Sequence, residues 1–272
     1  MYSKDNIYII STDASKMPIS IVTRAYRSSE LKNLISNLST NNELEFEVIA
    51  VCNIKDSDYD NIKIIVEDSN MFRARITGIR NAKSERLLLL DSDQIPEKGL
   101  LTELKTKIDD MVIIPERSLR HNVVGRFLDD WRFRNERRAF RHPRPEIPVI
   151  PRFYWKRQLI KVIENLPKNV FDNVSHEDSV LYHRVFTDSN DIGFTTKYIL
   201  NDDPSLATLL RKSYKYGKYI KEAFDLELPN DIVDLITKLN KSSLSIGELG
   251  IGKGLILQLL RGFIYELGRK FG

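Results

Sequence analysis

Cysteine, histidine and long apolar runs are scarce in this chain of 272 residues. Its single cysteine, Cys52, excludes an intramolecular disulfide and a cysteine-based zinc site, which fits a reducing cytoplasm. No apolar run approaches the roughly 20 residues of a membrane-spanning helix, and residues 1–5 lack the apolar stretch of a signal peptide. We therefore expect a cytoplasmic protein, either free or peripheral on the cytoplasmic face of the membrane.

Two further absences limit the kinds of metal site and phosphate-binding loop that the chain could contain. Of the 4 histidines, His176 and His183 lie too far apart along a predicted helix to chelate zinc well. Residues 23–28 contain no glycine, although a nucleotidyltransferase would need a glycine-rich phosphate loop at that point. A nucleotidyltransferase is therefore kept only as an alternative function for the chain.

One stretch stands out among what is present. Leu87 to Leu90 are four consecutive leucines, which predict a strand buried on both faces of a parallel sheet. Asp91 and Asp93 follow it, and Pro96 and Gly99 predict a turn there. Paired carboxylates suit a hard divalent cation such as Mg²⁺, which usually shares its remaining positions with substrate phosphates. The alternative is a solvated acidic turn.

The elements around this stretch alternate in type. Apolar runs predict strands at residues 18–23, 46–52, 62–66 and 87–90, and helical spacing predicts helices from residue 28 and over 72–83. This order is typical of an open α/β sheet, in which ligands bind outside the carboxyl ends of the strands. Asp91 and Asp93 are expected at such an end.

The motifs in this order resemble those of the family 2 glycosyltransferases. The resemblance depends on residues 19–26, on residues 74–79 running into 87–93, and on residues 175–184 with their adjacent Glu and Asp. It covers roughly residues 18–215. It implies a GT-A fold, a mixed, mainly parallel sheet flanked by helices, and an inverting, metal-dependent hexosyltransferase of glycan biosynthesis.

The resemblance also implies a donor site. Thr23 and Tyr26 match the loop that contacts the base and ribose, and Arg75 matches an arginine near the donor sugar and phosphates. Asn53 stands where the family usually has an acidic residue, and its amide can still bond a uracil or guanine edge. The expected donor is a sugar nucleotide of UDP or GDP, with Asp91 among its ligands.

The resemblance also implies metal ligands and a catalytic base. Asp91 and Asp93 match the D-x-D motif that holds Mg²⁺ or Mn²⁺ on the diphosphate, the second usually being the direct ligand. Asp178 matches the general base for the acceptor hydroxyl, and Glu177 its supporting neighbour. The alternative for both acids is a helix cap after Ser175.

Other positions depart from the family pattern. Ile76 replaces an asparagine, and Asn201 stands where many relatives have a histidine. A third metal contact from that segment is therefore open, with Asp202 or Asp203 as substitutes.

The formal net charge of +4 is unevenly distributed. Residues 117–152 mix arginines with aromatic residues, a composition that suits a phosphate-bearing acceptor or an anionic membrane, because the arginine fork pairs phosphate oxygens. The alternatives are a solvated helix with internal ion pairs and a non-catalytic protein that binds nucleic acid or glycan. We expect no nucleic-acid partner.

The end of the chain predicts an amphipathic helix at residues 255–267 with basic neighbours. Such a helix fits a membrane interface, although packing against the protein or a second subunit would explain its apolar face equally well. We predict a catalytic domain over 1–203, with a donor half at about 18–95 and an acceptor half at about 96–203, and a helical extension over 204–272. The acceptor is expected to be a lipid-linked or membrane-proximal glycan. The sequence leaves the oligomeric state open.

Overall fold

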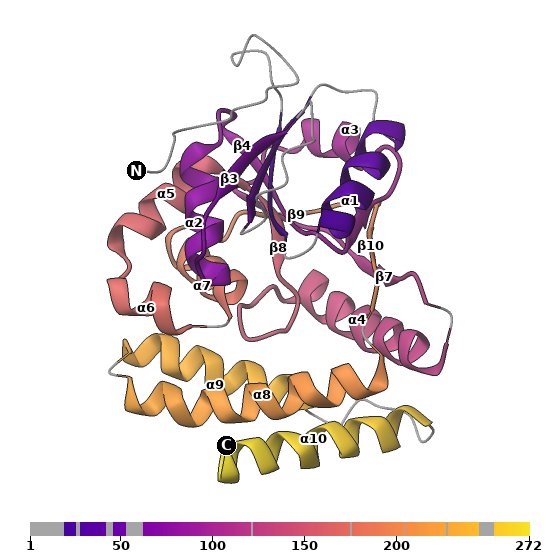
Figure 1. Cartoon of the computed structure of the whole chain (residues 1–272), viewed down its shortest axis with the longest axis vertical. Coiled ribbons are helices and arrows are strands. Elements are labelled where there is room, and N and C mark those ends of the chain that lie inside the picture. The colour runs from indigo at the N-terminus through magenta and orange to yellow at the C-terminus, as the bar shows by residue number, and fades with distance from the viewer. Residues whose placement is uncertain are drawn as a thin grey trace. The chain divides into compact units, whose positions relative to one another are not determined.

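The chain folds into two compact units, seen in a computed structural model (Figure 1). The structure describes residues 19–25, 28–41, 46–52, 62–120, 122–174, 176–203, 205–226, 228–244 and 253–272. Unit 1 comprises Met1–Glu116, Pro151–Leu166 and Arg184–Asn201, and unit 2 comprises Arg117–Ile150, Pro167–His183 and Asp202–Gly272. Each unit is therefore assembled from segments that alternate along the chain.

Unit 1 contains a 7-stranded sheet of order β3-β2-β1-β4-β8-β6-β9. Its strands are β1 (Ser20–Ala25), β2 (Glu47–Cys52), β3 (Lys63–Val66), β4 (Arg86–Asp91), β6 (Met111–Ile113), β8 (Pro151–Trp155) and β9 (Ile192–Phe194). All neighbours pair in parallel except β8, which is antiparallel to both β4 and β6. The predicted mixed, mainly parallel sheet is confirmed.

Strand β4 lies in the middle of this sheet. Its leucines from Leu87 to Leu90 are buried, as predicted, but only β1 is a parallel neighbour, because β8 runs the other way. The chain turns earlier than predicted, at Ser92 and Asp93 themselves. A second turn follows, where Gly99 adopts a positive φ of 84° that favours glycine.

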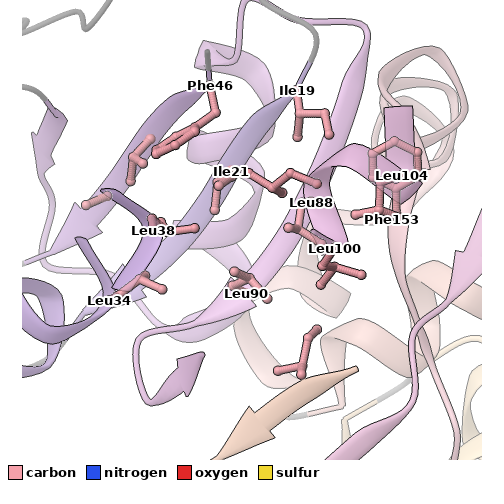
Figure 2. Packing of buried hydrophobic residues seen from close by; sticks show 14 of the residues in the cluster. Ile19, Ile21, Leu34, Leu38, Phe46, Leu88, Leu90, Leu100, Leu104 and Phe153 are labelled. Atoms are coloured by element: carbon pink, nitrogen blue, oxygen red, sulfur yellow. The ribbon is translucent and has the colours of Figure 1, made fainter. Parts of the chain in front are cut away.

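Helices pack on the sheet of unit 1. They are α1 (Ser28–Asn41), α2 (Met71–Asn81), α3 (Leu100–Lys105) and α5 (Lys156–Asn165). Leu34 and Leu38 of α1 pack with Ile21 and Leu88 of the sheet in one apolar core (Figure 2). On α2, a side chain at Gly78 would overlap with Val22, so glycine allows the helix to approach β1 closely.

A small sheet of order β5-β10-β7 extends beyond β4. Its strands are β5 (Gln94–Pro96), β7 (Glu116–Ser118) and β10 (Ile199–Asn201). Strand β5 pairs antiparallel with β10, so that Gln94 lies opposite Asn201. This pairing brings distant parts of the sequence to the end of β4.

The described part of unit 2 is mostly helical. Its helices are α4 (Val123–Arg141), α6 (Lys168–Asn173), α8 (Leu206–Asp225), α9 (Asn230–Leu244) and α10 (Lys253–Phe271), together with the start of α7 (Glu177–Asp188). Three of them form the predicted C-terminal helical extension, α8, α9 and α10 (Figure 1). None of the helices that the structure describes is both long and apolar enough to cross a bilayer. The predicted domain boundary at residue 203 stays a prediction.

Candidate functional site

The carboxyl ends of β1 and β4 lie side by side in unit 1. In the register of these strands Thr23 pairs with Leu90, and Arg24 pairs with Asp91. Thr23 and Asp91, which are distant in sequence, are thereby brought to one edge of the sheet. This is the edge at which open α/β sheets bind ligands.

Asp91 is held by two arginines. Arg75 on α2 donates from Nη2 to Oδ1 of Asp91 at 2.9 Å, and its side chain is only 2% exposed. Arg152 on β8 places its Nη2 3.5 Å from the other carboxylate oxygen. The carboxylate charge is therefore balanced on both sides, which offsets the cost of its partial burial.

A closed ring of polar contacts includes both the backbone and the carboxylate of Asp91. The backbone N–H of Asp91 donates to Oε1 of Gln94 at 3.0 Å, and Nε2 of Gln94 donates to Oδ1 of Asn201 at 2.9 Å. Nδ2 of Asn201 donates to Oε2 of Glu116 at 3.1 Å, and Nε of Arg152 donates to Oε1 of Glu116 at 3.1 Å. Arg152 returns to Asp91, so the ring joins five strands and fixes the backbone at the end of β4.

Asp93 differs from Asp91 in its surroundings. It is exposed, on the turn between β4 and β5. Its neighbour Ser92 is buried and donates from Oγ to Oε2 of Glu30 on α1 at 3.0 Å, which anchors the turn. The second carboxylate of the motif is thus exposed, whereas the first is half-buried between Arg75 and Arg152.

No cluster of three or more His, Cys, Asp or Glu side chains suited to a metal ion occurs among the described residues. Asp91 and Asp93 could supply two oxygen ligands from one turn. This donor set fits a hard cation that takes its other ligands from phosphate and water.

Thr23 also has an unusual environment. Its side chain is buried, and Oγ1 has no hydrogen-bond partner among the described residues. A buried hydroxyl without a partner is costly, and a ligand at this edge could satisfy it. The other two predicted base and ribose contacts, Tyr26 and Asn53, lie outside the described residues.

The predicted base and its neighbour lie in unit 2. Glu177 and Asp178 form the first turn of α7, and Glu177 is buried whereas Asp178 is half-buried. The positive end of the helix dipole stabilises negative charge there. The alternative capping residue, Ser175, lies outside the described residues.

His176 lies just before α7 and His183 lies on it. Neither belongs to a metal cluster among the described residues. Burial lowers the pKa of His176 to about 4, so its ring, 5.1 Å from that of Tyr216, is neutral at pH 7. His183 lies 3.5 Å from Oδ2 of Asp231. Both contacts are within unit 2 and support a packing role.

Asp202 and Asp203, the suggested substitutes for a third metal ligand, are paired with arginines in unit 2. Arg132 forms a fork with Asp203, with N to O distances of 2.9 and 2.5 Å, and Asp203 is buried. Arg120 donates from Nε to Asp202 at 2.8 Å. These carboxylates therefore serve in ion pairs inside unit 2.

The same contacts bear on the arginine-rich segment. Arg117 joins the set by binding both carboxylate oxygens of Glu136 at 2.8 Å. Internal ion pairs, the alternative considered for this segment, thus account for Arg117, Arg120 and Arg132. Other members are exposed on or beside α4, namely Arg126, Arg137, Arg141 and Arg144.

Sequence reasoning missed the ring around Asp91. Sequence reasoning places Arg152 in the basic segment and on a predicted strand at residues 148–154, which the structure confirms as β8, but it gives no site role to Arg152, Gln94 or Glu116. Gln94 carries the one local signal, because it immediately follows the D-x-D motif. Asn201 was noted only as a departure from the family pattern, whereas the structure gives it two partners.

The family model described as Glycosyl transferase family 2 matches residues 20–164, which is more than half of the chain. A search of curated proteins found no match.

The solved structures that resemble the chain include three of TarS from S. aureus. TarS 1-349 has a TM-score of 0.56 at 16% identity, covering 93% of this chain and 81% of that one. Its complex with UDP has a TM-score of 0.54 at 16% identity, with coverage of 86% and 76%. Its complex with UDP-GlcNAc has a TM-score of 0.52 at 14% identity, with coverage of 85% and 73%.

These structural matches establish the fold, and they confirm the predicted GT-A architecture. The family match covers both β1, with Thr23, and the β4 turn, with Asp91 and Asp93. It selects sugar transfer over the nucleotidyltransferase and the non-catalytic binding protein considered from sequence. The chain belongs to glycosyl transferase family 2 and is a glycosyltransferase.

Proposed function

We propose that the protein is a metal-dependent, inverting glycosyltransferase that moves a sugar from a nucleotide diphosphate to an acceptor hydroxyl. The observation that carries this proposal is the paired edge of β1 and β4. There Asp91 is held between Arg75 and Arg152 while Asp93 faces solvent. The UDP and UDP-GlcNAc complexes of TarS support a UDP-sugar donor, and a GDP-sugar is the alternative.

The donor would bind along this edge. Arg75 lies within reach of a phosphate placed at Asp91, and the buried hydroxyl of Thr23 would gain the hydrogen bond it lacks among the described residues. Tyr26 and Asn53 are proposed contacts to ribose and base. Together these residues would orient the sugar nucleotide with its diphosphate toward the β4 turn.

Asp93 and Asp91 would hold Mg²⁺ or Mn²⁺. Asp93 is the better direct ligand, because both oxygens of Asp91 already face arginines. The ion would stabilise negative charge on the leaving diphosphate. Arg75 would assist from the protein side, since guanidinium groups pair phosphate oxygens with two parallel hydrogen bonds.

Asp178 would deprotonate the acceptor hydroxyl, and Glu177 would support it. General-base catalysis of this kind contributes roughly 10²–10⁴-fold. With one base and attack opposite to the leaving group, the configuration at the anomeric carbon would be inverted. The acceptor we propose is a lipid-linked or membrane-proximal glycan, reached by peripheral association with the cytoplasmic membrane face.

The test is isothermal titration of UDP and GDP, each with Mn²⁺ and with a chelator. We expect metal-dependent binding of one nucleotide, reduced at least roughly tenfold in Asp93→Ala, because that substitution removes a direct ligand. Asp191→Ala is the matched control, since Asp191 is also exposed in unit 1 but away from the β4 turn. Binding that ignores the chelator and the Asp93 substitution would refute the metal site.

A further inference from the structure

Helix α10 carries an uncovered apolar stripe on one face. Ile256, Leu259, Leu260 and Phe263 are 70%, 50%, 38% and 62% exposed, and their spacing of three and four residues places them in one line. Leu257 and Tyr265, on the other side of the same helix, are buried. The stripe is therefore the outward face of a helix that is already packed.

The buried side of α10 explains why the stripe points outward. A side chain at Gly217 of α8 would overlap with the Tyr265 carbonyl, and one at Gly268 would overlap with the Tyr214 carbonyl. Leu257 packs with Phe127 of α4 and Leu209 of α8 in a second apolar cluster. Contacts within unit 2 thus fix α10 along its inner side, and packing on the protein accounts only for that side.

Helix α8 adds positive charge beside this helix. Arg211, Lys212, Lys215 and Lys218 are all exposed, and residues 206–220 contain no Asp or Glu. On α10 itself, Glu266 is paired with Arg269 at 2.6 Å, and Lys270 is exposed. The α8 and α10 pair therefore combines an apolar stripe with an excess of exposed cations.

We propose that the α8 and α10 pair is the surface with which the enzyme docks on an anionic lipid bilayer. The stripe enters the boundary between headgroups and acyl chains, and the cations of α8 contact anionic headgroups. The inference rests on the membrane-proximal acceptor proposed above and names the surface that brings the enzyme to it. The stripe spans too few residues for insertion across the bilayer, which fits reversible binding.

Charge argues for lipid over a second copy of the chain. A symmetric dimer through this face would place the same surface patch on both partners. The exposed cations Arg211, Lys212, Lys215 and Lys218 would then gather from both copies around one interface, where like charges repel. An anionic surface complements this charge instead.

Vesicle sedimentation tests the proposal on the full chain without donor or acceptor. We expect the protein to sediment with vesicles that mix phosphatidylcholine and phosphatidylglycerol, and much less with phosphatidylcholine alone. Ile256→Ser combined with Phe263→Ser should weaken binding by roughly tenfold or more, because two exposed apolar anchors are lost. Lys212→Gln combined with Lys215→Gln should weaken binding to the anionic vesicles only.

Ile108→Ser is the matched control, because Ile108 is 82% exposed but lies in unit 1. It should bind vesicles as the wild type does. The proposal is overturned if the wild type does not sediment, if it binds neutral vesicles equally well, or if the double serine variant binds unchanged. It is also overturned if light scattering finds a wild-type dimer that the double serine variant converts to monomer.

Nucleotide titration on the same variants separates this inference from the proposed function. The serine and glutamine variants should bind nucleotide as the wild type does, because none of the changed residues belongs to the donor site. Loss of vesicle binding with intact nucleotide binding supports the docking surface. Vesicle binding by a protein that binds no nucleotide would leave the docking surface standing and refute the donor site.

Discussion

The two carboxylates of the D-x-D motif are alike in sequence and different in structure. Asp91 is tied to two arginines and, through its N–H, to Gln94, whereas Asp93 is exposed on the turn. The arginines offset the charge of Asp91 and hold its position before any ligand binds. At this scale, we propose that both carboxylates hold the metal ion, with Asp93 as the more direct ligand and Asp91 kept in place by its two arginines.

Arg152 is the residue whose loss should disturb this arrangement most. Its side chain is 7% exposed and contacts both Asp91 and Glu116. Arg152→Gln should lower the free energy of unfolding by about 1–3 kcal/mol, because Asp91 and Glu116, two partly buried carboxylates, each lose a charged partner. Denaturant titration measures the loss, and isothermal titration should find weaker nucleotide binding.

Two further variants make this prediction specific. Arg157→Gln removes an arginine that is 66% exposed and 3.7 Å from Asp110, so its cost should stay below about 1 kcal/mol. Arg152→Lys should recover only part of the loss, because an ammonium group cannot reproduce the guanidinium fork. Equal free energies of unfolding for Arg152→Gln and the wild type would show that the ring of contacts around Asp91 does not stabilise the fold.

At the scale of elements, local pattern predicted the first part of unit 1, up to β4. Apolar runs predicted β1, β2, β3 and β4, and helical spacing predicted α1 and α2, because these elements carry apolar residues in runs or at helical spacing, most of which are buried. The strands of the small sheet were not predicted. They are three residues long, and their pairing joins Gln94 to Asn201, which lie 107 residues apart.

The same reasoning explains which parts of the site could be predicted. Motif residues such as Asp91, Asp93 and Arg75 stand next to recognisable elements, and the structure joins Asp91 to Arg75. Glu116 and Arg152 follow no motif, and their role depends on strands that meet only in the folded sheet. No local signal in the sequence could have shown that contact.

The packing of α10 on α8 depends on glycine. Gly217→Ala would force the new methyl group into the Tyr265 carbonyl, which is backbone and cannot move aside cheaply. We expect a loss of about 1–3 kcal/mol, typical of overpacking. A thermal melt should record it as a lower Tm.

Gly262→Ala is the matched change on α10, the other helix of this pair, at a position that does not face α8. A methyl group there meets nothing within 4 Å, so only helix propensity changes. We expect a gain of about 0.5–1 kcal/mol, because alanine loses less conformational freedom than glycine. Equal effects of the two substitutions would contradict the close contact between the helices.

At the scale of the whole molecule, the chain divides its proposed chemistry between two units. Unit 1 carries the donor edge with Asp91 and Asp93, and unit 2 carries Glu177 and Asp178. The segments of the two units alternate along the chain, whereas the predicted domains are continuous stretches, and the boundary at residue 203 stays a prediction. Helix α7 passes from one unit to the other, with Asp178 near its start and Arg184 already in unit 1.

In the function proposed here, donor binding and acceptor activation belong to different residues. The most direct measurement compares Asp178→Asn with the wild type in nucleotide affinity and in turnover of the nucleotide sugar that the wild type binds. Hydrolysis can serve as the turnover assay, because water takes the place of the acceptor hydroxyl. We predict unchanged affinity and turnover reduced by roughly 10²–10⁴-fold. Wild-type turnover in Asp178→Asn, or loss of nucleotide affinity equal to that in Asp93→Ala, would contradict the account.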